Sequence, residues 1–201
     1  MSWINSSIVS MIRIMPRWSI HPFAKTYVAG ESVQETVLVV KKVNDRGFTC
    51  TLDILGEHVK SAAEAENITR EYCELYDVIA VENMNCNISI KLTHIGLALD
   101  KTIVTDNLVR ILKQAKKHDN FLRIDMENSP YTQQTIDLYN NCVSDYPNMG
   151  IVLQAYLKRS LEDAHNLNRT GFNTRVCKGI YDERETIALK EIGRASCRER
   201  V

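Results

Sequence analysis

Five polar or charged side chains each follow a short apolar run, and these residues are the best suited to chemistry. They are Asp53, Lys91, Asp125, Gln154 and Lys178. Carboxylates, ammonium groups and an amide together offer charges of both signs and both donors and acceptors of hydrogen bonds. Polarity resumes wherever a strand ends, so each residue alone carries little weight. The five together predict one binding mouth for a polar, charged ligand.

The apolar runs alternate with helical patterns along the chain. The expected strands cover residues 48–52, 87–90, 121–124, 150–153 and 173–177. The expected helices cover residues 32–46, 57–82, 103–118, 132–146 and 160–168, and a last one starts near Asp182. The first helix opens with a capping box, in which Ser32 is followed three residues later by Glu35. Strands that alternate with helices predict parallel βαβ units, whose ligands bind at the carboxyl ends of the strands.

Both a doubly wound sheet and a (β/α)8 barrel are built from such units. The eight glycines are spread thinly, and neither G-x-G-x-x-G nor G-x-x-x-x-G-K-[ST] occurs. The phosphate-binding loops of the nucleotide-binding folds are therefore missing. We expect an α/β fold of the (β/α)8, TIM-barrel type. Such a barrel needs eight units and about 250 residues, so the five units of this sequence make it incomplete.

The composition is that of an ordinary globular protein, with 201 residues, 44% of them hydrophobic, and 25 basic against 25 acidic residues. Zero net charge without a basic stripe argues against nucleic-acid binding. No apolar stretch reaches the roughly 18 residues of a transmembrane helix, and the N-terminus lacks the features of a signal peptide. The six cysteines form no C-x-x-C pair and have no histidine at metal-ligand spacing. This pattern favours a reduced, cytoplasmic protein without a bound metal.

The last nine residues, at positions 193–201, read GRASCRERV and have no apolar periodicity. They resemble a translated cloning or adapter junction, and a solvated basic tail is the alternative. We therefore divide the sequence into a helical lead-in over residues 1–30, a partial barrel over 31–192 and this tail.

Six segments near the strand ends carry recognisable motifs. They read YVAGE (27–31), TLDILGE (51–57), ISIKLT (88–93), RIDMENSPYT (123–132), VLQAYL (152–157) and RVCKGIY (175–181). In this order and spacing they resemble the FAD-dependent proline dehydrogenase family, in particular its monofunctional bacterial branch. One segment alone is moderately specific, whereas the set of six is highly specific. The resemblance covers roughly residues 27–190.

The resemblance implies a distorted (β/α)8 barrel that holds FAD at the carboxyl ends of the strands. It also implies oxidation of L-proline to Δ1-pyrroline-5-carboxylate, the first step of proline degradation to glutamate, by hydride transfer to the flavin N5. Electrons then pass to a quinone or another acceptor. A quinone acceptor implies at least transient contact with a membrane.

For the cofactor, the resemblance implies contacts from Met126, Gln154, Arg175, Lys178, Gly179 and Ile180. Met126 is expected to use its backbone, because a thioether is a poor hydrogen-bond partner. Gln154 offers an amide donor and acceptor to the edge of the isoalloxazine ring. Arg175 places a fixed cation beside N5, where it stabilises the reduced, anionic flavin. Gly179 permits close approach of the backbone, and Lys178 offers charge to the phosphates.

For the substrate, the resemblance implies that Lys91 pairs with the proline carboxylate and that Tyr181 packs over the proline ring. Asp125 and Arg175 are the expected catalytic residues. The Asp125 carboxylate orients either the substrate amine or a neighbouring cation, and it could instead cap the helix that follows. Asp53 is expected to orient a residue that contacts the ligand, without contacting the ligand itself.

Two departures from the family pattern affect the expected activity. The usual R-L-V-K-G reads R-V-C-K-G at residues 175–179. The last three βα units are missing, and with them the paired arginines that clamp the substrate carboxylate, so we expect an incomplete, inactive fragment. Two other hypotheses stay open: a non-catalytic interaction module of the same fold, and a flavin-free barrel enzyme such as an aldolase with Lys91 as its Schiff base.

Overall fold

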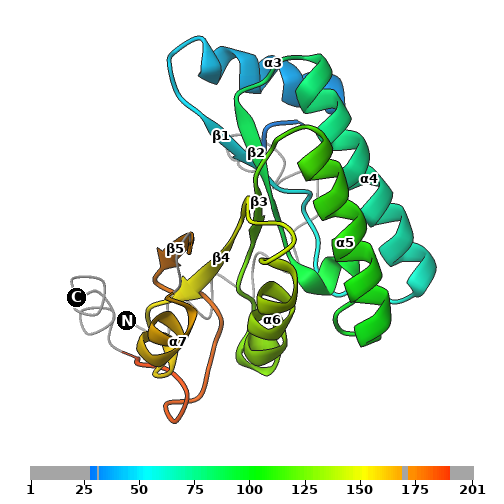
Figure 1. The fold of residues 1–201 in the computed structure, drawn as a ribbon. Coiled ribbons are helices and arrows are strands. Elements are labelled where there is room, and N and C mark those ends of the chain that lie inside the picture. The colour runs from blue at the N-terminus through cyan, green and yellow to red at the C-terminus, as the bar shows by residue number, and fades with distance from the viewer. Residues whose placement is uncertain (1–27, 31, 169–171, 191–201) are drawn as a thin grey trace, which may run out of the picture. The chain divides into compact units, whose positions relative to one another are not determined.

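The structure is a computed structural model, and it describes residues 28–30, 32–168 and 172–190 (Figure 1). The chain divides into two compact units, residues 1–50 and residues 51–201. The predicted lead-in lies outside the described residues except at 28–30, and the predicted tail at 193–201 lies wholly outside them. The division of the sequence into a lead-in, a partial barrel and a tail therefore stays a prediction.

The first unit contains helix α3 (Val33–Asn44). Its predicted cap is confirmed, because the Ser32 hydroxyl oxygen accepts a hydrogen bond from the Glu35 backbone N–H at 3.3 Å. The helix ends at Asn44, whose side chain donates to the Phe48 carbonyl at 2.9 Å. Gly47 then turns the chain with φ of +84°, a conformation that favours glycine.

The remaining elements follow in alternation. They are β1 (Cys50–Leu52), α4 (Ala62–Val81), β2 (Cys86–Ile90), the 3-10 helix η1 (Leu92–Ile95), α5 (Lys101–Lys117), β3 (Leu122–Ile124), α6 (Ser129–Cys142), β4 (Met149–Gln154), α7 (Ser160–Leu167) and β5 (Thr174–Cys177). Helix α4 starts later than predicted because Ser61 caps it, accepting from the Glu64 backbone N–H at 3.2 Å. The chain from 53 to 60 forms a loop instead, and η1 was not predicted.

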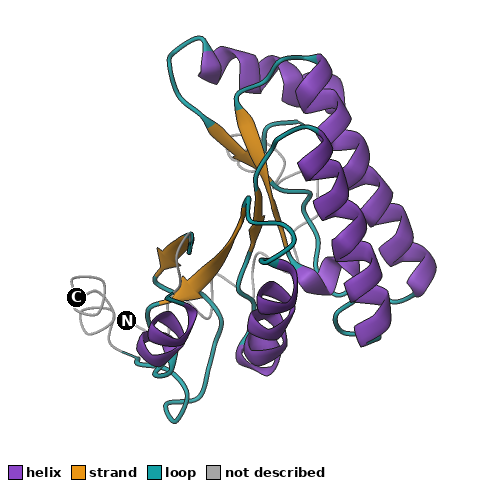
Figure 2. Cartoon of the chain, in the orientation of Figure 1, coloured by secondary structure: helices purple, strands orange, loops and turns teal. Residues whose placement is uncertain are grey.

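The five strands form one sheet in the order β1-β2-β3-β4-β5. The pairs β2–β3, β3–β4 and β4–β5 are parallel. A barrel requires this sequential order, whereas a doubly wound sheet reverses its order at a switch point. In the second unit the helices α4 to α7 follow one side of the curved sheet (Figure 2). The predicted incomplete TIM-type barrel is therefore confirmed.

The two faces of the sheet differ in polarity. Ile88 and Ile90 of β2, and Leu122 and Ile124 of β3, are fully buried. Successive side chains of a strand point to opposite faces, so Ser89 and Arg123 lie on the other face. Lys91 and Asp125, one residue past their strands, continue that same face. The polar face of the strands thus leads directly to the predicted binding mouth.

The prediction of a helix that starts near Asp182 is wrong for residues 182–190, because this segment forms turns. The Lys158 backbone N–H donates to the Ile187 carbonyl at 2.9 Å, and the Leu189 N–H donates to the Tyr156 carbonyl at 2.8 Å. The Glu183 carboxylate accepts from the backbone N–H of Ser129, at the start of α6, at 2.6 Å. These contacts compete with helix formation because they fix the backbone elsewhere and place an acidic group at another helix's N-terminus.

None of the helices within the described residues is long and apolar enough to cross a membrane. The described cysteines are all free thiols: Cys50, Cys73, Cys86, Cys142 and Cys177. Burial raises the pKa of the Cys142 and Cys177 thiols, which makes both poor nucleophiles at neutral pH.

One ion-pair cluster joins α4 to α5. A carboxylate oxygen of Asp77 accepts hydrogen bonds from Gln114 Nε2 at 2.6 Å and Lys117 Nζ at 3.1 Å, and His118 Nε2 lies 2.7 Å from it. The hydrogen bonds from His118 and Lys117 lower the pKa of Asp77 below its ordinary value of 3.8. A lowered pKa in the folded state contributes stability above pH 3.8, and that contribution is lost as the pH falls through the lowered value.

Replacing Asp77 by asparagine should therefore lower the free energy of unfolding at pH 7 by less than about 1 kcal/mol, since the side chain is half exposed and solvent screens its charge. The difference from the wild type should shrink as the pH falls below 3.8. Urea unfolding at several pH values measures this difference, with Asp106→Asn on the exposed side of α5 as the control. An equal difference in the free energy of unfolding at every pH would contradict the lowered pKa of Asp77.

Candidate active site

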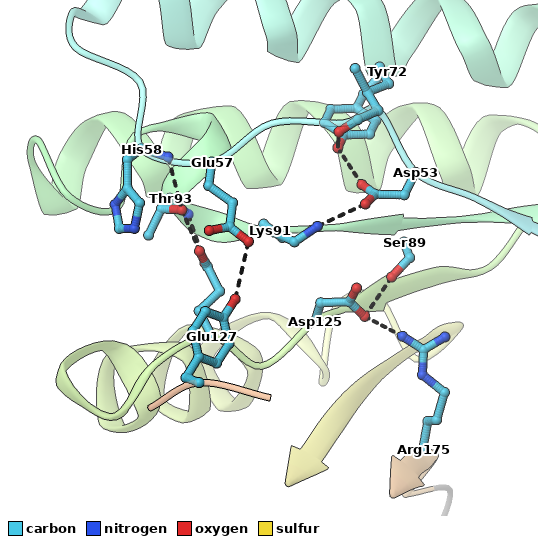
Figure 3. A network of polar contacts seen from close by, with 12 residues as sticks. Asp53, Glu57, His58, Tyr72, Ser89, Lys91, Thr93, Asp125, Glu127 and Arg175 are labelled. Carbon is cyan, nitrogen blue, oxygen red and sulfur yellow. Dashed lines mark hydrogen bonds and ion pairs between the residues drawn. The ribbon is translucent and has the colours of Figure 1, made fainter. Parts of the chain in front are cut away.

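Four of the predicted site residues lie together, three of them directly after the carboxyl ends of strands and one within a strand (Figure 3). Asp53 follows β1, Lys91 follows β2, Asp125 follows β3, and Arg175 lies within β5. They form two ion pairs, Lys91 with Asp53 and Arg175 with Asp125. The sequence predicted the side chains that meet here, but not which of them pair.

Asp125 holds the cation of β5. One of its carboxylate oxygens accepts from Arg175 Nη2 at 2.5 Å and from the Ser89 hydroxyl at 2.6 Å. The carboxylate is mostly buried, whereas about half of the Arg175 side chain is exposed. Of the three roles left open for Asp125, the structure contains the contact with a neighbouring cation, whereas the N-cap of α6 is Asn128. The guanidinium has five N–H donors, so donors that Asp125 does not use are available to a ligand.

Lys91 is held by Asp53. Its ammonium lies 2.8 Å from a carboxylate oxygen of Asp53, and the Tyr72 hydroxyl donates to the other oxygen at 3.1 Å. Burial opposes the charged form of Lys91, but the hydrogen bond and charge of Asp53 outweigh burial and raise the pKa of the ammonium. Lys91 therefore stays a cation at neutral pH. The supporting role of Asp53 stays a prediction, and its contact with Lys91 is compatible with that role.

Gln154 is buried at the end of β4, and its amide nitrogen is already used. Gln154 Nε2 donates to the Met126 carbonyl at 2.7 Å and to the Glu127 carbonyl at 3.2 Å. Its amide oxygen is buried and has no hydrogen-bond partner within the described residues. In this geometry only the acceptor of Gln154 is left for a ligand, and the Met126 carbonyl is engaged as well.

The chain after β5 forms a turn that carries Lys178 to Tyr181. Gly179 has φ of +99°, and a Cβ added there would lie 2.1 Å from Cδ1 of Tyr156. The Tyr156 hydroxyl donates to the Tyr181 carbonyl at 3.0 Å, and the Tyr181 hydroxyl donates to a Glu57 carboxylate oxygen at 3.2 Å. Ile180 is 89% exposed. The turn therefore packs on Tyr156 while its apolar tip faces solvent.

A pocket lies beside this turn. Its lining carries both charges: Lys178 and Lys190 are accompanied by Asp182 and Glu183. Lys190 Nζ lies 3.2 Å from a carboxylate oxygen of Asp182. Of the two lysines, Lys178 has no carboxylate partner within the described residues, so it is the cation of this lining that can attract an anionic ligand. Neither Asp125 nor Lys91 lines this pocket, so the pocket and the charged pairs are separate parts of one strand-end surface.

A second polar group was not assigned a role from the sequence. It contains Glu57, His58, Thr93 and Glu127 (Figure 3). One ligand atom from each of Glu57, His58 and Glu127 lies within 4.8 Å of the others, so the three could hold a metal ion. Glu57 and Glu127 stand inside the recognised motifs, but no sequence signal indicated that Glu127 would be buried and bonded to Thr93.

Comparison with known proteins identifies the family. The family model described as proline dehydrogenase matches residues 37–196. Proline dehydrogenase 1 of Bacillus subtilis is 35% identical over 168 residues, which cover 84% of this chain and 56% of that protein. The proline dehydrogenase of Deinococcus radiodurans is 30% identical over 84% of this chain and 56% of its own length. The chain thus spans little more than half of these relatives.

A solved structure agrees with the sequence comparison. It is that of proline utilization A from Bdellovibrio bacteriovorus, inactivated by N-propargylglycine. The two superpose with a TM-score of 0.72 at 27% sequence identity, over 78% of this chain and 20% of that one. The similarity extends over most of the partial barrel.

Proposed function

Because this chain belongs to the proline dehydrogenase family, we propose that its site oxidises L-proline to Δ1-pyrroline-5-carboxylate with FAD as the hydride acceptor. The observation that carries the proposal is the presence of two held cations, Lys91 and Arg175, on one polar face at the strand ends. Each has its own carboxylate partner. A zwitterionic amino acid and an anionic cofactor both need cations fixed in advance.

The residues present fit a flavin. The unpaired amide oxygen of Gln154 is buried, and leaving a buried acceptor unsatisfied costs about 1–3 kcal/mol. The ring N–H of an isoalloxazine edge is a donor that would satisfy it. Lys178 in the adjacent pocket would pair with a cofactor phosphate. Arg175 would lie beside the ring with the N–H groups that Asp125 leaves unused.

The chain's own residues would divide the remaining tasks. Lys91, kept charged by Asp53, would pair with the proline carboxylate. Arg175, held by Asp125, would stabilise negative charge on the ring, and Tyr181 would cover the substrate. When bound, FAD supplies the electrophilic N5 that accepts the hydride. A quinone or another oxidant as the electron acceptor, and a cytoplasmic location, also belong to the proposal and rest on the resemblance in sequence.

Dye reduction by the protein expressed from the complete gene tests this function. We expect a bound flavin spectrum and reduction that depends on proline. Lys91→Met should raise KM for proline roughly 10-fold to 100-fold, the effect of losing one charge-assisted hydrogen bond. Lys113→Met, on the exposed side of α5, is the matched control. A flavin-free protein, or a KM that Lys91→Met leaves unchanged, would refute the proposal.

The aldolase hypothesis is disfavoured by the state of Lys91. A Schiff-base lysine needs a lowered pKa so that its amine is neutral, whereas the partner Asp53 raises the pKa of Lys91. Borohydride trapping at Lys91 with a carbonyl compound should therefore give no adduct.

A further inference from the structure

Glu127 is a buried carboxylate that makes contacts beyond its own strand end. It lies two residues after Asp125, and 1% of it is exposed. One carboxylate oxygen accepts from the Thr93 backbone N–H at 3.0 Å, and the other accepts from the Thr93 hydroxyl. Burial raises the pKa of Glu127, and the two bonds from Thr93 oppose that rise. A buried carboxylate is costly unless its acceptors are satisfied, so this pairing with Thr93 is specific.

Thr93 also forms a hydrogen bond with the loop after β1. Its hydroxyl oxygen accepts from the His58 backbone N–H at 3.3 Å. Because the hydroxyl has one proton, and that proton is donated to Glu127, the chain of bonds runs in a fixed direction. His58 N–H donates to Thr93, and Thr93 donates to Glu127. His58 also has φ of +51°, a left-handed conformation that costs a non-glycine residue about 1 kcal/mol or more.

These bonds join the ends of three strands. Thr93 lies two residues after Lys91, and His58 lies next to Glu57, which accepts from Tyr181. The Glu127 carbonyl also accepts from Gln154 of β4. Glu127 makes none of the ion pairs of Lys91 or Arg175, yet it is bonded to the segments that carry the site residues.

We propose that Glu127 is a positioning residue, which through Thr93 sets the place of Lys91 at the end of β2 and of Glu57 after β1. The inference deepens the proposed function, because Lys91 is the residue proposed to bind the substrate carboxylate. Glu127 itself touches neither substrate nor cofactor. Replacing Glu127 should therefore lower the affinity for the substrate and raise the exposure of the Lys91 amine.

Four variants test the proposal. Glu127→Gln keeps the shape but has one oxygen where Thr93 needs two acceptors, so its NH₂ group faces either the Thr93 hydroxyl or the Thr93 backbone N–H. Thr93→Val removes the hydroxyl, and Thr93→Ser restores it. Glu183→Gln is the matched control, because Glu183 is also buried and accepts from a backbone N–H and a hydroxyl, both from Ser129, at the start of α6.

The first readout needs no activity. An amine-acylating reagent is applied to each folded variant, and labelling of Lys91 is compared with labelling of exposed Lys113 in the same sample by mass spectrometry. We expect Lys91 labelling to rise about 10-fold in Glu127→Gln and Thr93→Val, the effect of losing one charged hydrogen bond. Thr93→Ser and Glu183→Gln should match the wild type. Unchanged Lys91 labelling in both Glu127→Gln and Thr93→Val would overturn the proposal.

The second readout is kinetic and uses the protein expressed from the complete gene. KM for proline should rise by a similar factor in Glu127→Gln and Thr93→Val, with a smaller change in kcat, and Thr93→Ser should recover it. A fall in kcat with KM unchanged would overturn the proposal. If Glu127→Gln does not fold, the pair Thr93→Val and Thr93→Ser decides. If the wild type does not oxidise proline, the proposed function fails, while the labelling comparison still decides the role of Glu127.

Discussion

Replacing Asp125 by alanine is expected to lower proline-dependent dye reduction by about 100-fold to 1,000-fold, the size of effect seen when one preorganised electrostatic group is removed. The carboxylate is the partner of Arg175 at 2.5 Å and of Ser89 at 2.6 Å. Without it, the half-exposed guanidinium is free to turn toward water, so its charge is no longer fixed at the proposed flavin site. Loss of order in a positioning group reduces the rate even when binding persists.

Asp125→Asn should lie between the wild type and Asp125→Ala. The amide keeps an oxygen that can accept from Arg175, but it loses the charge that strengthens the bond. Steady-state dye reduction and a flavin absorbance spectrum separate lost turnover from lost cofactor. Asp145→Ala, at an exposed position after α6, is the control. Turnover by Asp125→Ala within a factor of about three of the wild type would refute the role given to this residue.

Gly179→Ala is expected to disrupt the turn after β5. Its φ of +99° costs an alanine roughly 1–2 kcal/mol, and the new Cβ would lie 2.1 Å from the Tyr156 ring. The ring has little freedom to move, because its hydroxyl donates to the Tyr181 carbonyl and its backbone N–H donates to the Lys178 carbonyl. Overpacking adds about 1–3 kcal/mol.

In Gly179→Ala, backbone strain and overpacking together should raise the local opening of the turn by about 100-fold. Flavin binding should weaken to a similar extent. Tryptic cleavage after Lys178 and Arg184 measures the opening. Gly47→Ala separates the two causes, because Gly47 has φ of +84° and nothing within 4 Å of an added Cβ. It should cost only the backbone strain. Equal costs for the two variants would show that the Tyr156 contact is unimportant.

The sequence predicted which strand ends carry charge, because each polar residue directly follows an apolar run. It could not predict which of them pair. Lys91 and Asp53 stand 38 residues apart, and Arg175 and Asp125 stand 50 apart. Which carboxylate faces which cation depends on how far each strand is shifted against its neighbour, a property of the register. Gln154 shows the same limit, since its amide nitrogen turns toward two backbone carbonyls that no sequence pattern marks.

Helix boundaries were predicted well where the cap is local and poorly where a distant contact decides. Ser32 and Glu35 lie three residues apart, and the cap formed as predicted. The predicted helix over 57–82 wrongly included the loop that carries Glu57 and His58, which is held in place by Thr93, 35 residues away. The helix expected near Asp182 fails for a similar reason, because Glu183 bonds to Ser129, 54 residues earlier.

The order of the strands has a consequence for how the chain is made. Each strand before β5 has the next strand along the chain as a neighbour. Each pairing therefore closes a loop that holds a single α-helix. Pairing then requires only the chain synthesised so far. During translation at about 5–20 residues per second, each new strand can add to the edge left by the one before it. The sheet can thus grow in the direction of synthesis, and this order allows Asp53, Lys91 and Asp125 to come together before β5 has left the ribosome.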